Sequence, residues 1–402
     1  MIKKILSLLL SAAMLLTMMM PASAEEPVQQ KENTAQEQSG EQKQSSVPVD
    51  IRATTAVLMD AGTGQVLIDK DANKPMHPAS ITKIMTILLV IEAIDTGKIT
   101  INDMVTVSED AAKKGGSQIW LEVGETMSVD DLLKAAVVGS ANDACAALAE
   151  YIAGSEPAFV TMMNQRAAQL GMKNTNFENC SGLDDETVNH ITTAYDIALM
   201  ARELISHDII FKYTTIWMDS LRGGKTELTN TNKLIKTFEG ITGLKTGTTE
   251  KAGYCVCATA KREGMHLIAV VLDGESSKLR FSSAAAMMNW GFANYTFVNP
   301  QIDMSAITQV KVLHGQQLSI SPVVGSPEPV LVKKGEEANI TQTVELSPDV
   351  CAPVENGQVL GTVKFTLDGK VVSEAKICAP EAVAQMDFGS AYKKIWGNLV
   401  CN

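Results

Sequence analysis

Three short polar motifs stand in order along this 402-residue chain, and their side chains could form a nucleophilic site. The first is SITK at 80–83, at the start of an almost wholly apolar run. The second is SAN at 140–142, and the third is KTG at 245–247. Each motif alone is weak, because a combination such as S-x-x-K often arises by chance. All three in this order are a strong indication of serine chemistry.

The first motif supplies a nucleophile and a base. Residues three apart on a helix share one face, so the Lys83 amine can reach the Ser80 hydroxyl. A serine at its ordinary pKa is a poor nucleophile and needs such a base. Burial, the nearby cation Lys245 and the helix N-terminus would each lower the pKa of Lys83, and the helix N-terminus would also favour an oxyanion. A capping serine with a surface lysine is the alternative, but a surface lysine does not fit in an apolar run.

The other two motifs supply polar groups around this pair. Ser140 and Asn142 could be mere helix caps. Beside the nucleophile, however, their hydroxyl and amide would relay a proton and hold a substrate amide. Lys245 and Thr246 could be ordinary surface residues of a strand. Gly247 has no side chain, which would let a substrate backbone lie close along the strand edge.

The sequence pattern around these motifs predicts the helices and strands that position them, and together these form an α+β domain. The apolar run 80–94 has helical spacing and no polar face, so this helix should lie in the middle of the domain. Other elements follow from apolar periodicity, alternation and turn residues. The strands are 54–60, 65–69, 241–248, 253–260 and 265–272, and the helices are 129–152 with a break near 139–140, 158–170, 193–205 and 277–293. Helices packed on an antiparallel sheet would then fill residues 50–298.

The pattern changes after residue 298. Short alternating segments separated by Gly, Pro, Asp and Asn predict a small, sandwich-like β domain over 299–379. Residues 380–402 have the pattern of an amphipathic helix whose apolar sector suits a membrane interface. A helix docked on its own protein is the alternative. The sector consists of Ala384, Phe388, Ala391, Tyr392, Ile395 and Leu399.

The N-terminal residues predict export. Residues 1–24 combine two lysines, an apolar run and an A-x-A ending, which is typical of a signal peptide cleaved after Ala24. An uncleaved anchor is the alternative. Residues 25–49 hold few apolar side chains and are predicted to be a disordered tether. The net charge of −12 argues against a nucleic-acid partner.

The seven cysteines form no recognisable disulfide or metal framework. Cys255 and Cys257 are the only close pair, and without a histidine nearby they are predicted to be small buried side chains. No H-E-x-x-H motif and no G-x-S-x-G motif occurs, so neither a zinc peptidase nor a Ser-His-Asp hydrolase is expected. We therefore expect neither a metal nor a cofactor.

Beyond the motifs, the chain resembles the low-molecular-mass penicillin-binding proteins of the D-alanyl-D-alanine carboxypeptidase family over about residues 50–400. The similar stretches are HPASITKIMT, SANDACAALAEYIAGS, FENCSGLD, GITGLKTGTTEKAGY, LRFSSAAAMMNWGF and NGQVLGTVKFTLDGK. The resemblance implies an enzyme at the outer face of the cytoplasmic membrane, in the cell-wall space. It would remove the terminal D-alanine from peptidoglycan stem peptides and be inhibited covalently by β-lactams.

The resemblance also implies catalytic roles. Ser80 would be the acylated nucleophile and Lys83 its general base. Ser140 would pass the proton to the leaving D-alanine amine, while Asn142 would orient Lys83 and the substrate. The middle motif is often S-G-N in this family, so Ala141 is a departure that leaves the fine geometry of Ser140 open.

The same resemblance implies a site for the terminal carboxylate of the substrate. Lys245 and Thr246 would hold it. Arg280 would add a second positive contact, with a solvated residue at a helix start as the alternative. The backbone N–H groups of Ser80 and Thr248 would form the oxyanion hole.

Two other functions use the same constellation. A DD-endopeptidase would act on crosslinked wall peptides with the same residues. A non-catalytic penicillin sensor would keep Ser80, but all the expected catalytic groups are present, which favours an enzyme. A class A β-lactamase is disfavoured, because the region KNTNFENCSGLD lacks that family's E-x-x-L-N glutamate and because the β domain and the C-terminal helix are foreign to that family.

Overall fold

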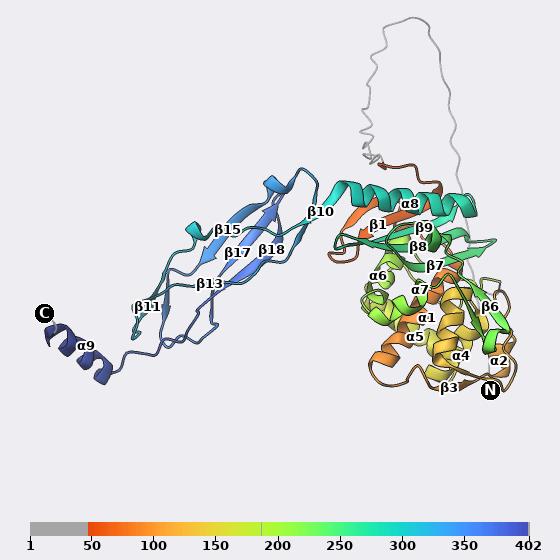
Figure 1. Ribbon diagram of the computed structural model, residues 1–402, viewed down its shortest axis with the longest axis horizontal. Coiled ribbons are helices and arrows are strands. Elements are labelled where there is room, and N and C mark those ends of the chain that lie inside the picture. Colours follow the sequence, from red (N-terminus) through yellow and green to blue (C-terminus); the bar gives the residue numbers. More distant parts are fainter. Residues whose placement is uncertain (1–46, 186, 401–402) are drawn as a thin grey trace, which may run out of the picture. The chain divides into compact units, whose positions relative to one another are not determined.

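The computed structural model describes residues 47–400 except residue 186 (Figure 1). The predicted signal peptide, nearly all of the predicted tether and Cys401 lie outside the described residues, as do the side chains of residues 394 and 397–400. The described chain forms a mixed α and β region, then an all-β region, then a helix. The predicted α+β class with a second, all-β domain is confirmed.

A five-stranded antiparallel sheet lies at the centre of the first region, in the order β2-β1-β9-β8-β7. The strands are β1 Ala53–Asp60, β2 Val66–Lys70, β7 Ile241–Thr249, β8 Gly253–Arg262 and β9 Met265–Gly274. The last three are the meander that the sequence predicts. Within the described chain β7 pairs on one side only, so its other edge can receive an extended peptide.

Helices cover both faces of this sheet, because successive strand residues point to opposite sides. On β1, Val57 and Met59 belong to a core shared with the larger helical layer, while Ala56 and Leu58 belong to the core under α8. Figure 1 shows α8 on one face and the other long helices on the opposite face. The bounds are α1 Lys83–Asp95, α4 Asn142–Ala153, α5 Glu156–Gln169, α6 Ala194–Leu204 and α8 Ser277–Asn294. Cys255 and Cys257 are fully buried, as predicted.

The central helix is buried on all sides, as its apolar composition predicts, since residues 83–91 are all buried. Its predicted start at Ser80 is wrong. A 3-10 turn, η1 (Ala79–Thr82), precedes α1. Ala79 has a φ of +48°, and a β-carbon on Gly182 would lie 1.8 Å from the Ala79 carbonyl oxygen. This distant loop, packed against the turn, sets a backbone conformation that local helix propensity does not predict.

The second motif lies where two helices meet. α3 (Val129–Lys134) runs into a π-helical turn, η2 (Ala135–Gly139), and α4 follows. Ser140 has a φ of +61°, a left-handed conformation of the kind that gathers at functional sites. The break predicted near 139–140 is confirmed. The smaller elements of this region are β3 Met104–Thr106, α2 Glu109–Ala112, β4 Thr126–Ser128, η3 Asp208–Ile210, α7 Phe211–Thr214, β5 Met218–Leu221, η4 Arg222–Gly224, β6 Thr226–Thr229 and η5 Lys233–Lys236.

From residue 295 to residue 386 the chain is mostly β-structure. β10 pairs with β14, and the other strands form one sheet in the order β12-β11-β16 and another in the order β13-β18-β17-β15. Two small apolar cores, around Val310 and around Phe365, hold them. The elements are β10 Tyr295–Val298, η6 Met304–Ala306, β11 Val310–Leu313, β12 Ser319–Ile320, β13 Val323–Val324, β14 Val330–Lys333, η7 Glu337–Asn339, β15 Thr341–Leu346, β16 Asp349–Cys351, β17 Val359–Leu367 and β18 Lys370–Cys378.

The terminal helix, α9, spans Phe388–Val400. Its predicted start near residue 381 is wrong, because residues 381–386 are bound to the β region instead. Val383 pairs with Val354, and the backbone N–H of Met386 donates to the carbonyl oxygen of His314 at 2.7 Å. In the part of the chain that is described, no helix is both long and apolar enough to cross a membrane.

Candidate active site

The hydroxyl of Ser80 and the amine of Lys83 are in direct contact. Lys83 Nζ lies 2.8 Å from Ser80 Oγ and donates a second hydrogen bond to the Ser181 carbonyl oxygen at 2.7 Å. Lys83 is fully buried, and burial lowers the pKa of its ammonium. A neutral Lys83 can accept the proton of Ser80, so the pair has the geometry of a nucleophile and its base.

Because Gly247 has no side chain, the turn that carries Ser80 can pack directly against β7. A β-carbon on Gly247 would lie 2.8 Å from the Pro78 carbonyl oxygen and 3.0 Å from the Ser80 backbone nitrogen. The sequence analysis explains this glycine by the approach of a substrate backbone. In the structure the close approach is that of the nucleophile turn itself. The edge strand β7 therefore lies directly against Ser80.

Ser140 and Lys245 form a second serine–lysine pair. Lys245 Nζ donates to Ser140 Oγ at 2.8 Å and to the Thr246 carbonyl oxygen at 3.1 Å. Both members of the pair are buried. Burial is the main cause that holds the pKa of Lys245 well below its ordinary value, and the positive charges of Lys83 and Arg280 act in the same direction.

The rest of the second motif is compatible with this pair. Ala141 has a φ of −66°, which any residue can adopt, and a methyl group fully buried in the core. Asn142 is also buried and donates through Nδ2 to the Gly115 carbonyl oxygen at 2.7 Å. Its Oδ1 has no partner among the described residues. The predicted contact of Asn142 with Lys83 is not formed, and Oδ1 is available for a substrate amide.

The remaining predicted residues lie on β7 or contact it. Thr246 Oγ1 donates to Thr231 Oγ1 at 2.7 Å. Arg280 donates through Nη1 to the Gly247 carbonyl oxygen and to Thr248 Oγ1, each at 2.8 Å. The structure thus brings all the residues predicted from the motifs to one strand edge and the two turns that face it.

Arg280 is buried, so the alternative of a solvated helix-start residue is wrong. Its guanidinium carbon lies 4.8 Å from the centroid of the Phe281 ring and 5.7 Å from that of Tyr254. Burial lowers its pKa, and its Nε has no hydrogen-bond partner among the described residues. This arrangement brings a fixed positive charge to the backbone of β7 at the third motif.

A loop over residues 176–184 supplies contacts that the motifs did not identify. Its Ser181 carbonyl fixes Lys83, and Asn179 Oδ1 accepts the backbone N–H of Ser181 at 3.1 Å. Asp184 accepts a hydrogen bond from the Thr249 hydroxyl at the end of β7. The stretch FENCSGLD, which contributes to the family resemblance, was the only signal for these residues.

His190 connects this loop to the nucleophile turn. Its Nδ1 accepts the backbone N–H of Glu178 at 3.0 Å, so the neutral imidazole carries its proton on Nε2 and donates to Thr82 Oγ1 at 2.8 Å. Burial lowers the pKa of His190 to about 4. No sequence motif points to His190, since its partners are brought together by the fold.

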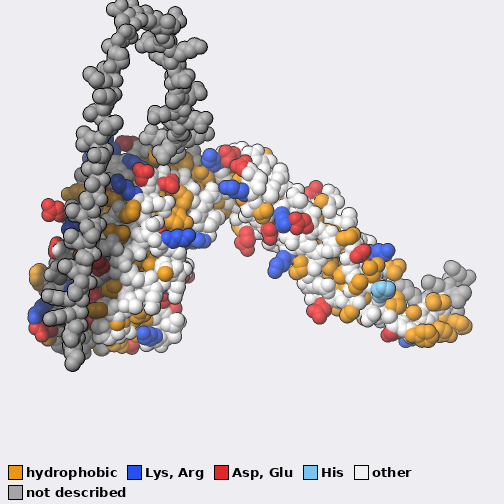
Figure 2. All heavy atoms as spheres, turned by 180° about the vertical axis from the view of Figure 1, so that it is seen from behind, with side chains coloured by type: hydrophobic (Ala, Val, Ile, Leu, Met, Phe, Trp, Pro, Cys, Tyr) orange, Lys and Arg blue, Asp and Glu red, His pale blue; other side chains and the backbone are white. Residues whose placement is uncertain are grey.

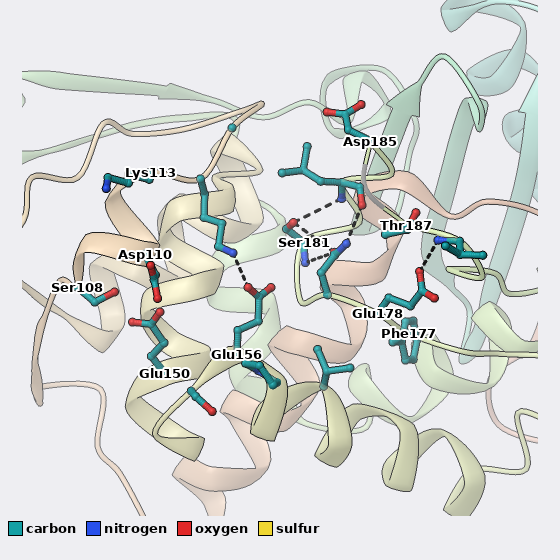
Figure 3. A pocket seen from close by; sticks show the side chains of 18 of the residues that line it. Ser108, Asp110, Lys113, Glu150, Glu156, Phe177, Glu178, Ser181, Asp185 and Thr187 are labelled. Carbon is teal, nitrogen blue, oxygen red and sulfur yellow. Dashed lines mark hydrogen bonds and ion pairs between the residues drawn. The ribbon is translucent and has the colours of Figure 1, made fainter.

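A cavity of about 1170 Å³ lies on this loop, and Figure 3 shows its side chains. Its lining includes Ser181 and the ion pair between Lys114 and Glu156. Glu178 also lines it, and its carboxylate accepts the backbone N–H of Val188 (Figure 3). None of the predicted site residues lines this cavity.

One cluster among the described residues has the composition of a cation site. Glu92, Glu203 and His207 offer ligand atoms within 4.8 Å of one another. Arg166 already pairs with both carboxylates, at 2.7 Å from Glu92 and 2.6 Å from Glu203. The guanidinium therefore takes the place that a metal ion would need, and the cluster is a surface ion-pair network.

Comparison with known proteins agrees with this geometry. A family model described as D-alanyl-D-alanine carboxypeptidase matches residues 41–276, and one described as penicillin-binding protein 5, C-terminal domain, matches residues 303–385. D-alanyl-D-alanine carboxypeptidase DacF of Bacillus subtilis is 41% identical over 350 residues, which cover 86% of this chain and 90% of that protein.

Two solved structures carry the same fold. Penicillin-binding protein 5 of Haemophilus influenzae superposes with a TM-score of 0.71 at 33% identity and covers 84% of this chain and 99% of its own. Penicillin-binding protein D2 of Listeria monocytogenes, in an ampicillin-bound form, has a TM-score of 0.56 at 32% identity. The match covers 61% of this chain and 98% of that protein's chain. The resemblance noted from the sequence is thereby confirmed, and the chain belongs to the D-alanyl-D-alanine carboxypeptidase family.

Proposed function

We propose that the protein is a serine DD-carboxypeptidase that removes the terminal D-alanine from peptidoglycan stem peptides through an acyl-enzyme. The observation that carries the proposal is the 2.8 Å contact between Lys83 Nζ and Ser80 Oγ, made by a fully buried lysine. A buried amine with a lowered pKa can be neutral at physiological pH, and only a neutral amine can act as the base.

In the acylation step, Ser80 Oγ attacks the carbonyl carbon of the penultimate D-alanine, and its proton passes to Lys83. The backbone N–H groups of Ser80 and Thr248 stabilise the oxyanion. The C–N bond then breaks, and Ser140 donates a proton to the leaving D-alanine amine. Ser140 is reprotonated through the lysines, of which Lys245 lies 2.8 Å from its hydroxyl.

In the deacylation step, water attacks the ester carbonyl while Lys83 accepts a proton from it. Ser80 leaves with a proton and is restored, and the peptide departs one residue shorter. The two serine–lysine pairs therefore carry both proton transfers without a metal or cofactor. Asn142 would hold the substrate amide through Oδ1, which has no partner among the described residues.

Lys245, Thr246 and Arg280 would hold the terminal carboxylate beside the edge of β7. A bound carboxylate would raise the pKa of Lys245, because an opposite charge favours the ammonium. The restored charge on Lys245 would in turn keep Lys83 neutral, since like charges repel. Arg280 would act through its positive charge and its hydrogen bond to the Thr248 hydroxyl, at 2.8 Å.

The same Ser80 would be acylated by β-lactams. The ampicillin-bound form of the Listeria relative supports this, because that protein shares the fold of the chain. We also propose that residues 1–24 are a signal removed on export to the cell-wall space. Residues 50–298 would be the catalytic domain and 299–379 the β domain, and the terminal helix would rest on the outer face of the membrane.

The test is D-alanine release from diacetyl-Lys-D-Ala-D-Ala by the purified mature protein and by its Ser80→Ala variant, with labelling by a fluorescent penicillin in parallel. We expect release and labelling in the parent protein and neither in the variant. Release that persists in Ser80→Ala would mean that another group is the nucleophile. Labelling without release would favour the endopeptidase or the sensor, and crosslinked wall fragments would then separate those two.

A further inference from the structure

Trp120 is an exposed aromatic residue in an unusual backbone conformation. Its side chain is 75% exposed, and its φ is +58°. A left-handed backbone is unfavourable for a bulky residue, and an exposed indole gains nothing from the core. Neither feature helps the chain to fold, so both require another explanation.

The backbone around Trp120 is fixed by buried polar partners. The Asp143 carboxylate accepts the N–H groups of Ile119 and Leu121, each at 3.1 Å. From the other side, Arg222 donates to the carbonyl oxygen of Ile119 at 2.8 Å and to that of Trp120 at 3.3 Å. Ile119 and Leu121 are themselves buried. The indole is therefore presented outward from a segment that is held on both sides.

This segment belongs to the wall of the active site. The backbone N–H of Asn142 donates to the Ser117 carbonyl oxygen at 2.7 Å, and its side chain holds Gly115. Asp143, which fixes the backbone beside Trp120, follows directly on α4. Asp143 lies three positions after Ser140 in the sequence, so their Cα atoms are at most about 11 Å apart. The segment that carries Trp120 and the catalytic groups are thus held by the same end of α4.

We propose that Trp120 is a stacking platform for the sugar of the glycan strand to which the stem peptide is attached. The inference rests on the proposed function. A five-residue stem spans at most about 17 Å when extended, so a peptide with its end at Ser80 can bring its sugar to this wall. Trp supplies a large, rigid face with one polar group. The neighbouring residues 115–118 (GGSQ) are uncharged, which suits a neutral, hydroxyl-rich ligand.

The experiment compares two substrates that share one peptide. The first is a disaccharide pentapeptide released from cell walls by a muramidase. The second is the same pentapeptide freed from its sugar by an amidase. Both are assayed for D-alanine release by the full mature protein. We expect kcat/KM to be roughly threefold to tenfold higher on the sugar-linked peptide, a factor of the size that one aromatic contact provides.

Trp120→Asn is the test variant, because asparagine tolerates a left-handed backbone and the loop keeps its shape. It should lose the preference for the sugar-linked peptide and keep its activity on the free peptide. Trp120→Phe should keep most of the preference, and Val123→Ala, at a residue 64% exposed in the same segment, should keep all of it.

An unchanged preference in Trp120→Asn would overturn the proposal, as would an equal loss on both substrates. An unchanged preference together with weaker sedimentation with anionic vesicles, or with a change in oligomeric state, would assign the indole to a membrane or to a second copy instead. Absence of D-alanine release from every substrate would contradict the proposed function, which is a different outcome.

Discussion

The imidazole of His190 donates to the hydroxyl of Thr82 at 2.8 Å, across 108 residues of sequence. Thr82 belongs to the turn that carries Ser80, and the other ring nitrogen of His190 holds the backbone of Glu178. The loop that follows Glu178 carries the Ser181 carbonyl, which fixes Lys83. His190 is therefore a positioning residue. It holds the turn that carries Ser80 in a fixed position relative to the Ser181 carbonyl, which binds Lys83.

The pKa of His190 predicts how stability depends on pH. Its folded value of about 4 lies below the ordinary 6.5, so the fold favours the neutral ring. The stabilisation is complete above about pH 6.5 and is lost as the pH falls towards 4. It amounts to roughly 3 kcal/mol at most. Urea unfolding at pH 4.5 and pH 7.5 should show a smaller pH effect in His190→Gln than in the parent protein.

His266 provides the matched control. Burial also lowers its pKa to about 4, and its Nε2 lies 2.9 Å from Thr242 Oγ1 in the sheet. His266→Gln should therefore reduce the pH effect on stability in the same way. The rate of penicillin acylation should fall about tenfold or more in His190→Ala, recover in part in His190→Gln and stay unchanged in His266→Gln. Equal acylation rates in all three variants would contradict the positioning role of His190.

A second prediction concerns Gly182, where a methyl group meets the nucleophile turn. A β-carbon there would lie 1.8 Å from the Ala79 carbonyl oxygen and 2.8 Å from Thr82 Oγ1. Gly182→Ala should therefore displace the turn and reduce penicillin acylation by about a hundredfold or more, the size of effect that misplaced reacting groups produce. The measurement is the labelling rate of the folded protein at 25 °C.

Gly171 is the control that distinguishes the clash with the nucleophile turn from the cost of placing alanine in a left-handed backbone conformation. Its φ of +78° is close to the +84° of Gly182, but a β-carbon on it meets nothing within 4 Å. Gly171→Ala should lower the unfolding free energy by roughly 1 kcal/mol and leave the labelling rate unchanged. Similar labelling rates in the two variants would show that the packing of Gly182 on the turn is unimportant.

The local patterns were sufficient for the strands of the sheet and for the first catalytic pair, Ser80 with Lys83. Alternation over 241–272 predicts β7, β8 and β9, and the spacing of three residues predicts the contact between Ser80 and Lys83. Each of these depends on neighbours in sequence. The partner of Ser140 did not follow from spacing, because Lys245 reaches it from a strand more than a hundred residues away.

The features that sequence reasoning missed depend on tertiary packing. Ser80 lies in a 3-10 turn because the Gly182 loop and β7 crowd the backbone there, which helix propensity does not register. His190 and Ser181 act through single hydrogen bonds whose partners no pattern connects. Gly247 was assigned to a substrate contact, whereas the nearest atoms belong to Pro78 and Ser80.

A third prediction concerns the charge state of Lys83. Lys83→Met keeps the size of the side chain and removes the amine, so acylation by penicillin should fall by about a thousandfold. The unfolding free energy should stay the same or rise, because a buried amine is replaced by an apolar group. In the parent protein the base is neutral above the lowered pKa of Lys83. Acylation should therefore decline as the pH falls through that pKa.

Lys83→Arg distinguishes a base from a mere hydrogen-bond donor. A guanidinium can donate to Ser80 Oγ and to the Ser181 carbonyl, but it stays charged at any pH that the fold survives. Acylation should be lost in this variant as well, with no recovery at high pH. Substantial labelling of Lys83→Arg would mean that proton abstraction by residue 83 is not required, and Lys245 would become the candidate base.

The last prediction concerns the proposed membrane contact of α9. Phe388, Tyr392, Ile395 and Trp396 are 89%, 57%, 62% and 58% exposed, and Figure 2 shows hydrophobic side chains gathered at this helix. Burying each in a membrane interface would contribute up to roughly 2 kcal/mol. A chain that ends at Asp387 keeps residues 381–386, which are bonded to the β region. It should therefore stay folded.

This shortened protein should lose sedimentation with lipid vesicles while it releases D-alanine from diacetyl-Lys-D-Ala-D-Ala at the parent rate. A double variant, Phe388→Ser with Trp396→Ser, should weaken vesicle binding with the chain length almost unchanged, which separates the apolar face from the loss of the segment. Lys393→Ala is the control for electrostatic attraction, because it removes one positive charge from the helix and leaves the aromatic residues in place. If the shortened protein still sediments with vesicles, the membrane contact must lie in another part of the chain, and the exposed face of α9 must serve a different partner.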